Sequence, residues 1–404
     1  MSLRPLIESR RVILCVGCGG VGKTTTAAAL GLAAAAAGKR ALCLTIDPAH
    51  RLAESLGLSE MMTEAQRIDP ARLREAGVPV RGSLTVMMLD TKSTFDELIA
   101  KHASSPEARE RILQNKLYRH VSTSLAGTRE YMAMEKLYAL KDDARWDLIV
   151  VDTPPTSNAL DFLDAPERMI DALDSAVLKW LAAAFQASGK LSFRLLARGA
   201  SAALRGMARL TGQGFLEALA EFIVLINEMF GGFRARATEV RKALRGDQVA
   251  YVLVTSPDPL SIREILYFGD RLREQRMPGD AVVVNRVRPE RRGRPSPSSV
   301  REELDRRRLR LGPDAEERVM RAFEDEARLG EMDRRNLGAL VALDDAVSRP
   351  LRVEIPAFAG DVHDLGTLAK VAAILAPFEE GLVEETLGSS PPSGTSQGRG
   401  RLGA

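Results

Sequence analysis

Seven short apolar runs are spaced along the 404-residue chain, and they limit the folds that it can adopt. Each run is rich in Val, Ile and Leu and does not alternate with polar residues, which is typical of strands buried on both faces of a parallel sheet. Helical stretches, such as residues 24–37 and 261–275, separate them. The runs cover residues 12–16, 41–46, 84–89, 148–151, 249–255, 281–284 and 351–355. This order predicts an α/β fold, a parallel sheet with helices on both faces.

Two segments interrupt the alternation of strands and helices. Residues 166–245 have helical patterns and no strand candidate, so we expect a helical subdomain inserted between strands. Residues 286–340 begin with Pro, Gly, Ser and ten Arg between positions 286 and 310, against four acidic residues, and continue as a charged helix.

One domain, which includes both insertions, is expected over residues 8–376. Its sheet core would comprise residues 8–165 and 246–376, and no internal repeat divides it. Residues 388–404 are mostly Gly, Ser and Pro and are expected to be disordered.

The composition excludes several classes of protein. With 45% hydrophobic residues the chain has enough apolar surface to fold, so whole-chain disorder is excluded. Lys plus Arg number 57 and Asp plus Glu 54, and a net charge of +3 gives too weak a field for chain-wide nucleic-acid binding. The Arg-rich segment lacks interleaved aromatic residues, so specific nucleic-acid recognition is not expected there either.

The three cysteines favour a reducing, cytoplasmic location. Cys15, Cys18 and Cys43 cannot form a complete disulfide framework. Cys15 and Cys18 have the C-x-x-C spacing, but no second pair or nearby His accompanies them, so no zinc site is expected. No apolar run approaches the roughly 18 residues that span a bilayer, and the first run is too short for a signal peptide.

The strongest motif is a phosphate loop. Residues 17–24 read GCGGVGKT, which fits G-x-x-x-x-G-K-[ST] between a predicted strand and a predicted helix. Glycines let backbone N–H groups turn toward phosphate oxygens, and the helix N-terminus attracts the same anion. Lys23 would reach the β- and γ-phosphates, Thr24 would bind Mg²⁺, and Thr25 would contact the α-phosphate. The predicted binding residues are Gly19, Gly20, Val21, Gly22, Lys23, Thr24 and Thr25.

Two aspartates follow apolar runs, at the edge of a parallel sheet where ligands bind. Asp152 follows residues 148–151 and is expected to hold Mg²⁺, directly or through water. Asp47 follows residues 41–46 and is expected to orient or deprotonate the attacking water. The predicted catalytic residues are thus Asp47 and Lys23. A turn or cap role remains the alternative for each aspartate.

The base-binding residues are harder to identify. Asn285 follows the run 281–284, and its amide could hydrogen-bond a purine edge. Arg286 and Val287 come next, so no N-K-x-D guanine motif is present, which favours ATP over GTP. Residues 356–364 follow the last run and could form a loop beside the base.

Three motifs in this order resemble the ArsA/GET family of P-loop ATPases. They are the phosphate loop, the stretch TIDPAH at residues 45–50 and the stretch DTPPT at residues 152–156. The resemblance covers most of residues 8–376, and residues 124–137 look like the bacterial single-domain branch. It implies an α/β parallel-sheet P-loop NTPase of the SIMIBI type, with a deviant Walker A loop and an inserted helical subdomain.

The resemblance also implies site roles and partners. Lys23, Thr24 and Thr25 would bind the phosphates and Mg²⁺, Asp47 and Asp152 would belong to the two switch segments, and Asn285 would lie beside the adenine. ATP and Mg²⁺ are the expected cofactors. The protein would act as a dimer with two nucleotides facing each other across the interface.

One departure from the family pattern affects catalysis. Cys18 occupies the place of a signature lysine that in the family reaches the partner's phosphates. Losing this positive charge can weaken phosphoryl transfer considerably. Three interpretations stay open: slow hydrolysis, an arginine substitute such as Arg51, or a heterodimer with a lysine-bearing paralogue instead of a homodimer.

The expected output is the handling of a hydrophobic client or a membrane partner protein. Leu216, Leu219, Ile223, Ile226 and Phe230 form an apolar stripe in the predicted subdomain, which suits a client groove or, more commonly, internal packing. An anion-exporter ATPase is the first alternative, although metalloid-binding cysteines are missing. A nucleotide-gated binding module with little turnover is the second, and a partitioning ATPase the third.

Overall fold

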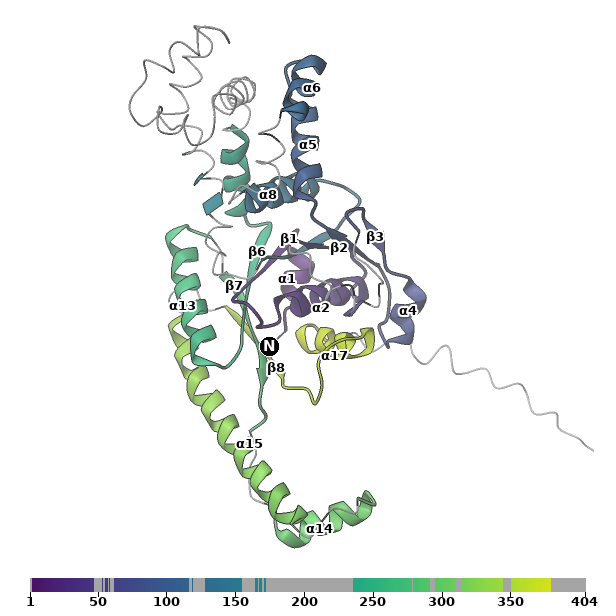
Figure 1. Ribbon diagram of the computed structural model, residues 1–404, viewed down its shortest axis with the longest axis vertical. Helices are drawn as coiled ribbons and strands as arrows, with labels where there is room; N and C mark the ends of the chain where they lie inside the picture. The colour runs from purple at the N-terminus through teal and green to yellow at the C-terminus, as the bar shows by residue number, and fades with distance from the viewer. Residues whose placement is uncertain are drawn as a thin grey trace, which may run out of the picture.

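A single twisted sheet forms the centre of the computed structural model (Figure 1). The structure describes residues 2–46, 62–115, 128–154, 235–277, 279–290, 295–309, 314–343 and 350–378, with a few isolated positions between them. The strand order is β3-β4-β2-β5-β1-β6-β7-β8. The strands are β1 (Val12–Val16), β2 (Arg40–Thr45), β3 (Gln66–Arg67), β4 (Ser83–Met88), β5 (Leu148–Asp152), β6 (Val249–Thr255), β7 (Gly279–Val287) and β8 (Leu351–Pro356).

All seven predicted strands are present, and their neighbours pair in parallel. The prediction of a parallel α/β sheet is therefore confirmed, with one addition. The two-residue β3 pairs antiparallel with β4 at one edge, and it is too short to leave a periodic signal. β1, β5 and β6 are buried along their whole length, which explains their unbroken apolar runs.

Helices cover both faces of this sheet. On one face lie α1 (Arg4–Ser9), α2 (Lys23–Ala36) and α17 (Leu365–Leu375), and on the other lie α5 (Thr91–His102), α8 (Thr128–Lys141) and α13 (Pro259–Glu274) (Figure 1). Successive strand residues enter opposite cores: Ile13 packs on the α2 side and Leu14 on the α13 side.

The central helix α2 explains how the sheet edge is shaped at the candidate site. Seven of its fourteen residues are alanine, the strongest helix former, and twelve of the fourteen are buried. Its small side chains let the helix lie close to the sheet, under α17. The N-terminus of α2 is thereby fixed at the carboxyl ends of the strands.

The charged segment after β7 forms two helices. α15 (Ala315–Leu337) projects from the sheet with its C-terminal end nearest to it, and α14 (Pro297–Arg306) lies at the distant, N-terminal end of α15 (Figure 1). The predicted boundary at residue 286 needs correction, because β7 extends to Val287. Asn285 therefore lies within β7 and does not end it. The register with β8 shifts between Val284 and Val287, and this irregularity hides the strand's end from the apolar pattern.

Candidate nucleotide-binding site

The phosphate loop follows β1 at the carboxyl edge of the sheet and leads directly into α2. Two close approaches explain its glycines. A Cβ atom at Gly17 would lie 2.0 Å from the Val254 carbonyl oxygen of β6, and one at Gly22 would lie 2.2 Å from Nδ2 of Asn285. Gly22 also has a φ of 97°, a left-handed conformation that favours glycine. The loop is thus wedged between β6 and β7 at positions where no side chain fits.

The start of α2 carries the predicted phosphate-binding groups. No side chain caps this helix, so its first N–H groups stay available to an anion. Lys23 is 6% exposed, and its Nζ donates to the carbonyl oxygen of Cys18 at 2.8 Å, so the ammonium lies across the loop. Gly19 and Gly20 are exposed at the loop's tip. The structure thus brings the predicted residues 19–25 into one continuous loop and helix start.

A buried carboxylate lies beside the loop at the end of β5. Asp152 is 1% exposed, and its Oδ2 accepts hydrogen bonds from the hydroxyls of Thr24 at 2.8 Å and Thr45 at 3.2 Å. Thr153 follows, and its hydroxyl donates to the Cys15 carbonyl oxygen at 2.7 Å. Carboxylate and hydroxyl oxygens so close together are ligands that suit Mg²⁺.

The other side of the loop meets β7. Nδ2 of Asn285 donates to the Val21 carbonyl oxygen at 2.9 Å, and its Oδ1 accepts from the backbone N–H of Arg286 at 3.0 Å. The Arg286 guanidinium donates from Nη1 to the Gly20 carbonyl oxygen at 3.4 Å. Two neighbouring residues of β7 therefore contact two neighbouring carbonyls of the phosphate loop.

Cys18 does not point outward, as the signature lysine that it replaces would need to do to reach a partner's phosphates. Its side chain is buried, and its thiol lies within hydrogen-bonding reach of Ser261 and Glu264 of α13. Burial raises the pKa of this thiol, so it stays neutral. Cys15 and Cys43 are also free and fully buried, and burial followed by the charge of Asp152 raises the pKa of both.

Some predicted residues lie outside the part of the chain that the structure describes. Asp47 and Arg51 are among them, as is most of the predicted subdomain 166–245 with its apolar stripe, and the tail 388–404. Their roles stay predictions.

Two side chains of the site, Thr45 and Arg286, are absent from the predicted site residues. Thr45 shares the Asp152 carboxylate, and the register of β2 with β5 places it directly opposite that residue. Its position two residues before Asp47 could have indicated it. Arg286 was used only to dismiss a guanine motif, and its left-handed φ of 61° leaves no signal in a sequence.

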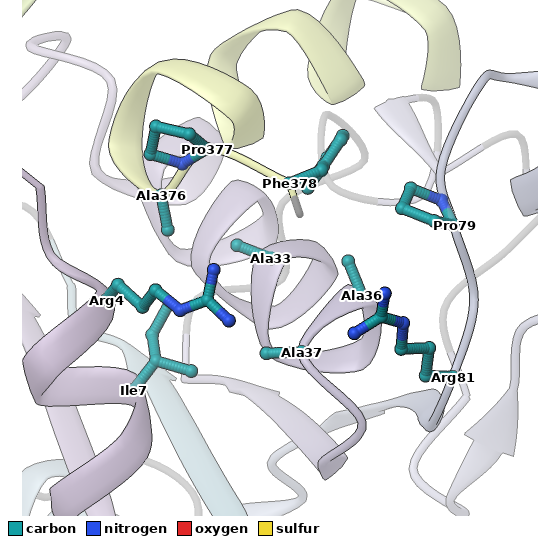
Figure 2. Close-up of a pocket in the computed structure, with 10 residues that line it drawn as sticks. All are labelled: Arg4, Ile7, Ala33, Ala36, Ala37, Pro79, Arg81, Ala376, Pro377 and Phe378. Atoms are coloured by element: carbon teal, nitrogen blue, oxygen red, sulfur yellow. The ribbon is translucent and has the colours of Figure 1, made fainter. Parts of the chain in front are cut away.

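A shallow pocket elsewhere is a weaker candidate. It lies at the C-terminal end of α2, beside Ala33 and Ala36, and Figure 2 shows it between Arg4, Arg81 and apolar side chains such as Phe378. Its volume of about 10 Å³ is near the minimum for one water molecule. A nucleotide cannot fit there, so the phosphate loop remains the candidate site.

Among the described residues, no group of three or more His, Cys, Asp and Glu side chains could hold a metal ion. No described helix is long and apolar enough to cross a membrane.

Comparison with known proteins settles the family. The model of the anion-transporting ATPase family, ArsA, matches residues 10–310 of the 404-residue chain. The chain belongs to the ArsA ATPase family. The prediction of an ArsA/GET-type P-loop ATPase is thereby confirmed, and with it nucleotide binding and ATP hydrolysis as the class of activity.

Individual relatives of this ArsA-family chain are GET3 ATPases. ATPase get3 of Aspergillus terreus is 26% identical over 289 residues, which cover 71% of this chain and 76% of the relative. ATPase GET3 of Podospora anserina is 25% identical over a stretch with the same coverage. ATPase GET3 of Malassezia globosa is 30% identical over 168 residues, or 41% of this chain and 45% of the relative.

Proposed function

We propose that this protein is a Mg-ATP-driven dimer switch that handles a hydrophobic client or membrane partner protein in the cytosol. The observation that carries the nucleotide part is the junction of Lys23, Thr24 and Asp152 at the end of β5. Family membership and the GET3 relatives support the dimer and the client. Free, buried cysteines are consistent with a reducing compartment.

The residues of the loop divide the work of phosphoryl transfer. Backbone N–H groups of residues 19–25 and Lys23 would bind the phosphates, and the base would lie toward Asn285. Thr24 and Asp152 would hold Mg²⁺, whose charge offsets that of the phosphate oxygens when it is bound. Asp47 would accept a proton from the water whose oxygen attacks the γ-phosphorus, and ADP would leave.

An anion exporter is not favoured as the alternative. The three relatives compared above are GET3 ATPases, and Cys15, Cys18 and Cys43 are buried in β1, the phosphate loop and β2. A binding module with little turnover has one specific observation in its favour. Cys18 faces α13, so the position of the family's signature lysine supplies no charge to a partner's phosphates.

The test is the Mg-ATP hydrolysis rate per chain over a wide range of protein concentrations. We expect the rate to rise with concentration, because a dimer would complete the site. The Lys23→Ala variant should neither bind nor hydrolyse ATP, since it removes the cation that lies across the loop. ATP binding without turnover at every concentration would contradict the switch and favour the binding module or a missing paralogue.

The client is tested separately, with the same rate as the readout. A peptide of about 20 apolar residues should change turnover, and a control peptide of equal length with charged residues should not. Equal effects of the two peptides, or none, would contradict a hydrophobic client.

A further inference from the structure

Arg286 is held against the phosphate loop in an unusual conformation. Its φ of 61° lies in the left-handed region, which costs a non-glycine residue energy, and it occurs where β7 shifts register against β8. The backbone N–H of Arg286 is fixed by Asn285 at 3.0 Å and its guanidinium by Gly20 at 3.4 Å. The strain and both bonds therefore act together to place one exposed guanidinium at the loop.

The guanidinium of Arg286 has no acidic partner among the described residues. The nearby Arg288, by contrast, is paired with Asp333 at 2.9 Å. The Arg286 side chain is exposed, and its contact to the Gly20 carbonyl oxygen uses a single N–H of the guanidinium, Nη1. An exposed, planar cation with a fixed edge is a suitable surface for an aromatic ring.

The two flanks of the loop give a bound nucleotide its direction. Thr24 and Asp152 mark the side of β5, where Mg²⁺ and the terminal phosphates would lie. In the strand order, β6 and β7 lie on the opposite side of β1. The nucleoside must therefore leave the loop toward the end of β7, where Asn285 and Arg286 are.

We propose that the Arg286 guanidinium is the stacking surface for the purine base of the bound nucleotide. This inference rests on the proposed function, because it needs a triphosphate in the loop. Arg286 contacts a loop carbonyl, and carbonyls of a phosphate loop face away from the anion that the N–H groups bind. This geometry favours a contact with the base over one with the phosphates.

The test compares two ligands by calorimetry, Mg-ATP and Mg-tripolyphosphate, which has no base. The Arg286→Gly variant tolerates the positive φ and removes only the side chain. It should weaken Mg-ATP binding roughly five- to thirtyfold, as expected for the loss of a cation–π contact. It should change tripolyphosphate binding by less than about twofold. Arg286→Lys keeps the charge without the planar face, so its affinity for Mg-ATP should lie between that of the unmodified protein and that of Arg286→Gly.

Arg276→Gly is the matched control. Arg276 is also exposed with a left-handed φ, 55°, but it lies between the end of α13 and the start of β7, at the amino ends of the strands and away from the phosphate loop. It should bind both ligands like the unmodified protein. Equal weakening of both ligands by Arg286→Gly would make Arg286 a phosphate contact and overturn the proposal, as would unchanged ATP binding. If the unmodified protein binds neither ligand, the proposed function itself is wrong.

Discussion

The phosphate loop is supported from two sides, and the two supports have opposite character. On the β5 side, Asp152 is 1% exposed and bonds the hydroxyls of Thr24 and Thr45. On the β7 side, Asn285 is half-buried and Arg286 is exposed, and both bond carbonyls of the loop. The same loop thus has a buried flank with a carboxylate and a solvent-exposed flank with a guanidinium.

This difference matches the two ends of a nucleotide. Charge acts most strongly in a buried, low-dielectric site, which suits the end where the γ-phosphate would react. An exposed flank can accept and release the nucleoside with little desolvation. Substitutions where the loop leaves β1 should disrupt both flanks. Substitutions within one flank should change either the turnover rate or the affinity for ATP, but not both.

The largest effect is expected for Gly17→Ala, at the first residue of the phosphate loop. The new Cβ would lie 2.0 Å from the Val254 carbonyl oxygen, and a backbone atom of a buried strand cannot move aside cheaply. We expect a loss of unfolding free energy of about 3 kcal/mol or more, and no measurable ATP binding. Denaturant unfolding and calorimetry measure the two quantities.

Gly20→Ala is the control for this substitution. Gly20 also has a positive φ, 78°, but a Cβ there would meet nothing within 4 Å. It should cost only about 1–2 kcal/mol, the strain of the left-handed conformation. Equal losses for both variants would mean that backbone strain, and not the close approach to β6, determines the result.

Within the buried flank, Asp152→Asn should abolish chemistry and spare the fold. The amide is nearly the same size but removes the charge that would hold Mg²⁺, so phosphate release should fall at least about 100-fold. Loss of a buried charge should leave thermal stability unchanged or raise it slightly. Magnesium titration of ATP binding should become flat.

Thr45→Val tests whether this effect belongs to the carboxylate itself. It removes one hydrogen bond, of 3.2 Å, and leaves the Asp152 charge in place. Turnover should therefore fall by only about fivefold, which corresponds to a bond worth about 1 kcal/mol. A loss as large as that of Asp152→Asn would show that the hydroxyl is equally essential to the site.

The buried flank was the easier one to predict from sequence, for physical reasons. Asp152 follows a fully buried strand, and such strands give continuous apolar runs whose ends can be read. The sheet and the helix α2 followed from the same signal, with boundaries within a residue or two except at β7, which ends three residues beyond its predicted run. The exposed flank depends on a register shift and a left-handed Arg286, and neither has a residue pattern.

The exposed flank should respond to Asn285→Ala through affinity. The substitution removes the bond to Val21 and the one from Arg286, each worth about 1 kcal/mol. We expect Mg-ATP affinity to fall about tenfold, with turnover at saturating ATP nearly unchanged. Steady-state kinetics separate the two.

Asn336→Ala is the matched control for the lost amide. Its Nδ2 also donates to a backbone carbonyl, that of Pro257, at 3.0 Å, but it does not contact the loop. It should have a similar cost in stability without a change in ATP affinity. If Asn285→Ala lowered maximal turnover as strongly as Asp152→Asn, the assignment of chemistry to one flank would be wrong.

The smallest effect on ATP binding is expected beyond the exposed flank, for Asp333→Ala near the C-terminal end of α15. Asp333 is 4% exposed and accepts from the Arg288 backbone N–H at 3.0 Å and guanidinium at 2.9 Å. Its loss should lower the unfolding free energy by about 1–3 kcal/mol, because the backbone donor loses its partner. ATP affinity should stay within about twofold, since Arg288 bonds away from the loop. A tenfold loss of ATP affinity would mean that the exposed flank and α15 are coupled, so that bound nucleotide could reposition helices α14 and α15.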